Sequence, residues 1–159
     1  METGMLIYIV DDRGIHGEYA EFLHAHKDSL PAFELEVFTH WQTLYEAILN
    51  KRPSAILADM RFDAIDRSEL YGDIEGLANT DRFCGNTERA EAQIRSMQGM
   101  LICRALREHQ ITVPIILFAS LAPAIQKNVT QTLQPIRIIE GLILHDVRDA
   151  LREIVVFNP

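Results

Sequence analysis

The sequence predicts an α/β fold in which helices cover both faces of an open, five-stranded parallel sheet. Five short apolar runs alternate with stretches whose apolar residues recur at helical spacing, which is typical of this class. Two of the runs, residues 5–10 and 54–59, end in carboxylates at Asp11, Asp12 and Asp59. Because parallel strands end at the same edge of a sheet, we expect these three acids to converge there.

Composition and charge restrict the class of protein. The chain has 159 residues, 48% of them hydrophobic and 24% charged, which suits one domain over residues 1–159. The net charge of −8 repels nucleic acid and anionic membranes, so we expect neither as a partner. No apolar run reaches the roughly 18 residues that span a bilayer, and Cys84 and Cys103 lack metal-binding or redox spacing. We therefore expect a cytoplasmic protein with two free thiols.

Changes in the spacing of apolar residues predict the N-terminal helices and strands. Residues 5–10 form a buried strand, and the helical spacing that follows predicts a helix over about residues 14–26. Alternation of polar and apolar residues over 34–38 indicates a half-exposed edge strand. Thr39 and Gln42 then have capping-box spacing, which predicts the start of a second helix with one apolar face.

The stretch after the third strand breaks this rhythm. The apolar run 54–59 fits a strand buried on both faces. Residues 62–86 have little periodicity and predict a long loop, whereas helical spacing returns over residues 87–109 and predicts one long helix. Gly99 within that helix indicates a bend or a close packing contact.

The C-terminal part completes the alternation. Residues 113–120 contain the most apolar strand candidate, and Pro123 can open the next helix at its first position. Residues 136–139 form a short last strand, and Asp146 can cap a final helix.

Several of these segments resemble the receiver domain of two-component response regulators, the CheY-like fold. The matching motifs are IVDD at 9–12, AILADM at 55–60, GMLICRALRE at 99–108 and VPIILF at 113–118. Apart from one insertion, the resemblance covers essentially the whole chain. It implies the strand order 2-1-3-4-5 and a part in phosphorelay signal transduction.

The resemblance also implies a site. By it, Asp59 would be the phospho-acceptor, and Asp11, Asp12 and Asp59 would hold Mg²⁺, with the carbonyl of Arg61 completing the metal shell. A few carboxylates with water are the environment that Mg²⁺ prefers in proteins.

Two departures from the family affect switching. The Ser or Thr that ends the family's fourth strand falls here on Ala119, and Ser120 comes one residue late. The family's lysine after the fifth strand falls on Glu140, or on His145 in another register. Two unit charges ~5 Å apart interact by roughly 3 kcal/mol at an effective dielectric of ~20. An acid in that place would therefore oppose a phosphoryl dianion, which predicts impaired phospho-switching.

The third departure is the insertion at about residues 62–98, between the third strand and the family's third helix. It must emerge beside the acidic cluster, so it could cover the site as a lid or present a partner-binding helix. The N-terminal half of the stripe from Ala90 to Ala105 could be exposed, pack as part of a lid, or self-associate. A homodimer is therefore one expected assembly.

We expect an atypical receiver domain that regulates through protein–protein contacts and is not an enzyme, with phosphorylation at Asp59 weak or lost. Its partners would be a sensor kinase or a downstream effector. The alternative is a working phospho-switch that uses Ser120 and an insertion arginine, Arg67 or Arg82, in place of the lysine. A less favoured alternative is a Mg²⁺-dependent phosphohydrolase with Asp59 as nucleophile and the insertion as cap.

Overall fold

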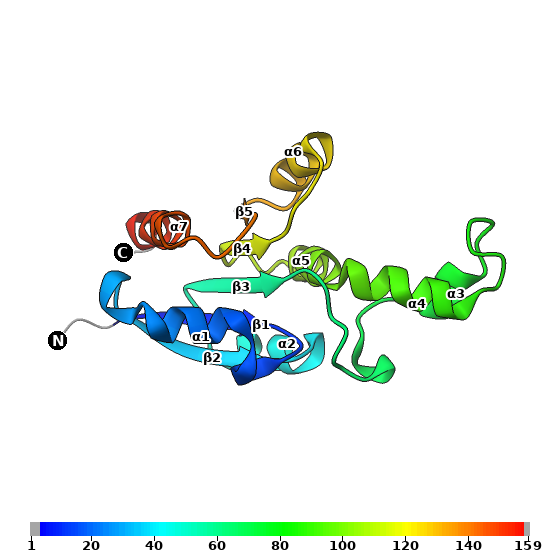
Figure 1. Cartoon of the computed structure of the whole chain (residues 1–159), viewed down its shortest axis with the longest axis horizontal. Coiled ribbons are helices and arrows are strands. Elements are labelled where there is room, and N and C mark those ends of the chain that lie inside the picture. Colours follow the sequence, from blue (N-terminus) through cyan, green and yellow to red (C-terminus); the bar gives the residue numbers. More distant parts are fainter. Residues whose placement is uncertain (1–3, 158–159) are drawn as a thin grey trace.

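A five-stranded parallel sheet forms the centre of the molecule (Figure 1). The structure, a computed structural model, describes residues 4–157. The strand order is β2-β1-β3-β4-β5, which confirms the predicted topology. The strands are β1 Met5–Val10, β2 Phe33–Phe38, β3 Ala55–Asp59, β4 Ile115–Phe118 and β5 Ile136–Ile139.

Helices connect the strands and cover the sheet. Within residues 4–157, none of them is long and apolar enough to cross a bilayer. The α-helices are α1 Glu18–Ala25, α2 Trp41–Asn50, α3 Ile74–Ala78, α4 Thr87–Ser96, α5 Gln98–Glu108, α6 Pro123–Thr132 and α7 Leu144–Phe157. The short 3-10 helices are η1 Gly14–His16, η2 Lys27–Ser29 and η3 Arg67–Glu69.

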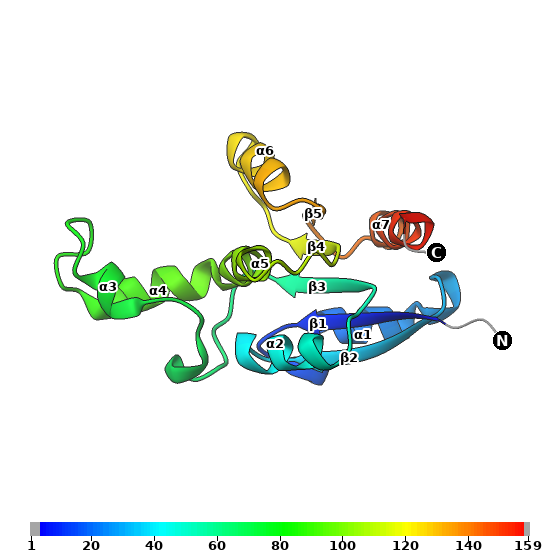
Figure 2. The same cartoon turned by 180° about the vertical axis from the view of Figure 1, so that it is seen from behind.

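Successive residues of each strand pack on opposite faces of the sheet, as the period of two requires. In β1, Ile7 and Ile9 belong to the core that α1 and α7 cover. Tyr8 and Val10 belong to the core on the other face, which α2, α5 and α6 cover. Figures 1 and 2 show this layered arrangement from opposite sides. The core of β3 is fully buried as predicted, because both layers close over it.

Two predictions in the N-terminal half are wrong in detail. The helix expected over 14–26 is shorter, because Gly14 has φ +59° and Gly17 is extended, so η1 and α1 are separate. The capping box from Thr39 to Gln42 is absent. His40 is the N-cap of α2, without a side-chain cap bond, and the Thr39 hydroxyl lies 2.9 Å from Nδ1 of His40 instead.

The helix expected over 87–109 is broken. It ends at Ser96 as α4 and resumes at Gln98 as α5, with Met97 at φ −121° between them. The helical spacing runs through the break, so the sequence pattern does not reveal it. The last helix begins at Leu144 rather than after Asp146, which lies in its first turn.

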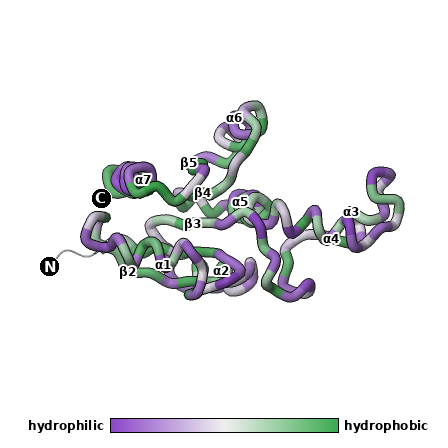
Figure 3. Tube along the Cα trace, in the orientation of Figure 1, coloured by the Kyte–Doolittle hydropathy of each residue, from purple (hydrophilic) through white to green (hydrophobic). Residues whose placement is uncertain are grey.

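The insertion is more ordered than the predicted loop. It contains η3, α3 and α4, and α3 packs along α4 around a small core of its own made by Ile74, Ala78, Phe83, Ala90 and Ile94. In Figures 1 and 2 the α3–α4 pair projects beyond the end of the sheet, and Figure 3 shows that the loop bearing η3 is largely hydrophilic. The apolar stripe at the start of the long helical pattern is therefore covered by the insertion itself.

Candidate functional site

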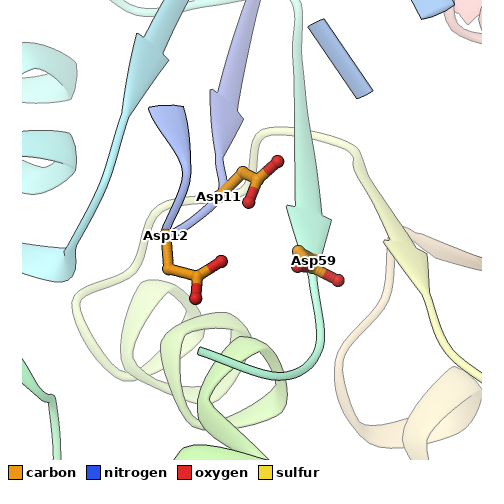
Figure 4. Close-up of side chains that lie close together, drawn as sticks. All are labelled: Asp11, Asp12 and Asp59. Atoms are coloured by element: carbon orange, nitrogen blue, oxygen red, sulfur yellow. The ribbon is translucent and has the colours of Figure 1, made fainter. Parts of the chain in front are cut away.

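Three carboxylates converge at the carboxyl ends of β1 and β3. The two strands pair in parallel with Val10 opposite Ala58, so Asp11 and Asp59 each lie one residue beyond this pair. Oxygen atoms of Asp11, Asp12 and Asp59 all lie within 4.8 Å of one another (Figure 4). The structure thus brings together the three acids that the sequence placed at one sheet edge.

The carboxylates open into a cavity of about 600 Å³. Its walls hold five acidic residues and two arginines, Arg13 and Arg61. The guanidinium of Arg61 lies 2.6 Å from the Asp63 carboxylate, so its charge is already paired. The cavity is lined by Asp11, Asp12, Arg13, Glu18, Tyr19, Asp59, Arg61, Asp63 and Ala64.

Asp12 joins the acidic cluster to the beginning of the insertion. Its Oδ2 atom accepts hydrogen bonds from the backbone N–H groups of Asp63 and Ala64, both at 2.7 Å. Neighbouring Phe62 and Ile65 are buried in the main core. The first residues of the insertion therefore form one wall of the site, while α3 and α4 project away from it, so the insertion does not close over the site as a lid.

Asp59 is held by two donors on one oxygen. The hydroxyl of Tyr19 and the backbone N–H of Met60 each donate to Oδ1 at 2.8 Å. Tyr19 lies in the first turn of α1 and is 7% exposed. Its ring packs against Phe118, the residue of β4 that pairs with Asp59, at 4.6 Å between ring centroids.

Burial and mutual repulsion raise the affinity of this cluster for protons. Burial and, to a smaller extent, the neighbouring acids raise the pKa of Asp11 to about 7. The hydrogen bond that the backbone N–H of Arg13 donates to Asp11 opposes this shift. Burial also raises the pKa of Asp59, although the hydrogen bonds from Tyr19 and Met60 oppose the shift. For Tyr19, burial and the charge of Asp59 raise the pKa, so the phenol remains a donor at neutral pH.

Two glycines allow the backbone to approach these acids. A Cβ on Gly17 would overlap the carboxylate of Asp11, and a Cβ on Gly99 would overlap the carbonyl oxygen of Asp59. The Gly99 N–H also donates to the carbonyl of Met60 at 2.9 Å. The close packing contact expected at Gly99 is thus the contact of α5 with the end of β3.

The predicted switch positions do not line the acidic cavity. Ala119 is buried, and the Ser120 hydroxyl donates to Oε1 of Glu140 at 3.0 Å. His145 lies on α7 and contacts Asp149 at 3.2 Å. Glu140 follows β5 but does not line the cavity, whose two further carboxylates are those of Glu18 and Asp63.

The insertion arginines also lie elsewhere. Arg67 contacts Glu75 and Glu91, and Arg82 lies over the ring of Phe83. Neither lines the acidic cavity, so the expectation that one of them replaces the lysine is wrong.

Sequence reasoning missed Arg13, Glu18 and Tyr19, which do line the cavity. Glu18 and Tyr19 lie at the start of α1, whereas the spacing of apolar residues predicted a helix from about residue 14 and so did not place them in its first turn. The first turn of a helix that follows a strand lies at the same sheet edge as the strand's carboxyl end.

The residues present fit a small divalent cation. Three carboxylates share a partly buried site, one of them with its pKa raised to about 7, and the cavity wall holds five acidic residues against two arginines. Oxygen ligands of this kind are those that Mg²⁺ prefers. Asp11, Asp12 and Asp59 would hold the ion, which would supply positive charge at the acidic cluster.

No protein-family model and no curated protein matches the sequence. Solved structures do match it. The apo receiver domain of nitrogen regulatory protein C superposes with a TM-score of 0.62 at 11% identity, over 97% of this chain and 96% of that chain. The receiver domain of the Francisella response regulator 1452 gives 0.63 at 9% identity, over 98% and 99%.

A third match is RcsB from Salmonella enterica serovar Typhimurium, solved bound to the promoter rprA with the phosphomimetic BeF₃⁻. It gives a TM-score of 0.56 at 15% identity, over 95% of this chain and 98% of that chain. These likenesses, with the strand order and the carboxylates at the strand ends, show that the chain has the fold of response-regulator receiver domains.

Proposed function

We propose that this chain is an atypical receiver domain that regulates through protein–protein contacts, with phosphorylation at Asp59 weak or lost. The observation that carries the proposal is that, within residues 4–157, no hydroxyl or charged side chain that follows β4 or β5 lines the acidic cavity. Ser120 and Glu140, which follow β4 and β5, are hydrogen-bonded to each other and do not line the cavity.

The charge around Asp59 supports weak phosphorylation. Five acidic residues line the cavity with two arginines, and one of these, Arg61, is paired with Asp63. An incoming phosphoryl group is an anion, so it meets net negative charge before any cation is bound. Mg²⁺ at Asp11, Asp12 and Asp59 would reduce that repulsion, but no lysine follows β5 to take over the charge.

The form of the insertion supports a role in contacting another protein. Arg95 fastens its base by donating to the carbonyls of Phe62 and Ile65 at 3.2 and 2.9 Å. The side chain of Gln98 is fully buried and exchanges two hydrogen bonds with the backbone of Tyr71. A projecting element with a fastened base and its own core can present a surface without a large ordering cost on binding.

Phosphorylation is tested by incubation with acetyl phosphate and Mg²⁺, followed by intact mass measurement. We expect a minor adduct or none in the wild type, and none in the Asp59→Asn variant. A stoichiometric adduct in the wild type that disappears in Asp59→Asn would overturn the weak-or-lost proposal. It would favour a working phospho-switch in which the positive charge comes from Arg13, which lines the cavity and forms no salt bridge within residues 4–157.

A catalytic role is tested with a generic phosphate ester such as p-nitrophenyl phosphate. We expect no Mg²⁺-dependent turnover above background. Turnover that is abolished by Asp59→Ala would contradict the proposal and establish a phosphohydrolase, because repeated release of product that depends on Asp59 is catalysis.

A further inference from the structure

The hydroxyl group that contacts Asp59 comes from α1 and not from β4. Tyr19 donates to Oδ1 of Asp59 at 2.8 Å, whereas Ala119 has no hydroxyl and that of Ser120 donates to Glu140. Tyr19 is nearly buried, and its ring is held against Phe118. A donor held this firmly restricts the side-chain torsion of its acceptor.

We infer that Tyr19 is a positioning residue: it holds the Asp59 carboxylate in the rotamer that presents it to Asp11 and Asp12. The inference deepens the proposed function and rests on it, because it requires that these three acids bind a divalent cation.

The two carboxylate oxygens of Asp59 differ in their hydrogen bonds. Oδ1 accepts from Tyr19 and from the N–H of Met60. The hydrogen bonds found among residues 4–157 include no donor to Oδ2, which leaves that oxygen to take a ligand. Side chains that hydrogen-bond a metal-binding carboxylate orient it, and their removal commonly weakens metal binding about 10- to 100-fold.

The hydroxyl and the ring of Tyr19 make different contacts, so a substitution can remove the hydroxyl bond and keep the ring contact. Tyr19→Phe keeps the ring that contacts Phe118 and removes only the donor to Asp59. Tyr8 offers a matched control, because it is also buried and its hydroxyl donates to the carbonyl of Lys51 at the same 2.8 Å. Tyr8→Phe therefore deletes one buried hydroxyl bond that does not touch the acidic cluster.

The experiment measures Mn²⁺ binding to the full chain from the electron paramagnetic resonance signal of the free ion, with Mg²⁺ as competitor. We expect Tyr19→Phe to weaken the affinity for both ions about 10-fold or more, and Tyr8→Phe to leave it unchanged. Far-ultraviolet circular dichroism checks that both variants keep the fold.

A spectroscopic readout separates positioning from general loosening. Cation binding should perturb the near-ultraviolet absorbance of the Tyr19 phenol, so a Mg²⁺ difference spectrum should appear in the wild type and in Tyr8→Phe but not in Tyr19→Phe. Equal affinity of Tyr19→Phe and the wild type would overturn this inference while leaving the acidic site intact. A wild type that binds neither ion would overturn the cation site, and this inference with it.

Discussion

Asp11 is the most deeply placed of the three clustered acids, with only 2% of its surface exposed. Burial raises its pKa from an ordinary value near 4 to about 7. The folded state therefore holds a proton that the unfolded chain releases at lower pH. Stability that depends on this proton is present below the unfolded pKa and is lost as the pH rises towards 7.

Replacing Asp11 by Asn should remove that pH dependence. Asn cannot ionise and can still accept the N–H of Arg13 through its side-chain oxygen. We expect the free energy of unfolding of Asp11→Asn to exceed that of the wild type by on the order of 2 kcal/mol at pH 8, and by much less at pH 4. Denaturant melts in chelator across this range measure the difference.

The exposed residue Asp28 provides the control, because Asp28→Asn removes one carboxylate outside the cluster. That variant should follow the wild type within about 0.5 kcal/mol at every pH. If Asp11→Asn also ran parallel to the wild type, the raised pKa of Asp11 would be refuted.

The carboxylates could be predicted from the sequence and the phenol could not, for a physical reason. Asp11 and Asp59 follow directly from strands, so the parallel register of β1 and β3 brings them together whatever their rotamers. The hydroxyl of Tyr19 lies at the end of a long side chain, and its contact with Asp59 depends on where α1 begins. That start is set by Gly14 and Gly17, whose conformations no periodicity reveals.

Prediction of secondary-structure elements from the sequence also fails where tertiary packing interrupts a continuous helical spacing of apolar residues. The helical spacing over residues 87–109 runs unbroken, yet the chain divides into α4 and α5. The first turn of α5 lies against the end of β3, where Gly99 touches the backbone of Asp59. Only a contact between distant segments specifies this break, so the spacing alone predicted one helix.

Gly99→Ala should therefore be destabilising although alanine is the better helix former. The added methyl would overlap the carbonyl oxygen of Asp59, which is backbone and cannot rotate aside. We expect a loss of about 1–3 kcal/mol in a denaturant melt, against a helix-propensity gain of up to about 1 kcal/mol. Gly141→Ala is the control, since a Cβ there meets nothing within 4 Å. A midpoint for Gly99→Ala equal to that of the wild type would show that α5 is free to move away.

A buried side-chain amide is one of the contacts that hold the base of the insertion. Gln98 is fully buried, accepts the N–H of Tyr71 at 2.7 Å and donates to its carbonyl at 2.9 Å. Gln98→Leu keeps the volume but leaves both backbone groups unpaired, which should cost roughly 2 kcal/mol.

Hydrogen exchange locates the loss due to Gln98→Leu. Amide protons around Tyr71 and in α3 should exchange faster, while those in β1 and β3 remain protected. Gln42→Leu, at an exposed glutamine of α2 whose side chain donates to Glu46, should change neither set. Uniformly faster exchange in the strands of Gln98→Leu would mean that the insertion and the sheet unfold together.

At the scale of the whole molecule, the sheet and the projecting part of the insertion have separate cores. Phe62 and Ile65 pack into the main core, whereas the small core of α3 and α4 shares none of its five buried residues with it. Gly72 lies close to Ile94, since a Cβ on Gly72 would be 3.4 Å from Cδ1 of Ile94. A short link can therefore join the two ends of the projecting part.

Replacing residues 72–94 by a short Gly/Ser linker should leave a folded receiver domain. The variant keeps Arg95, which bonds the carbonyls of Phe62 and Ile65, and Asp63, whose N–H bonds Asp12. We expect one cooperative unfolding transition and a Mn²⁺ affinity within about twofold of the wild type, because the wall of the acidic cavity is retained. Loss of cooperativity or of Mn²⁺ binding would show that α3 and α4 support the site itself. That result would contradict the proposal that the insertion is a separate contact surface. Removing a surface that only binds partners should not affect an ion bound at the edge of the sheet.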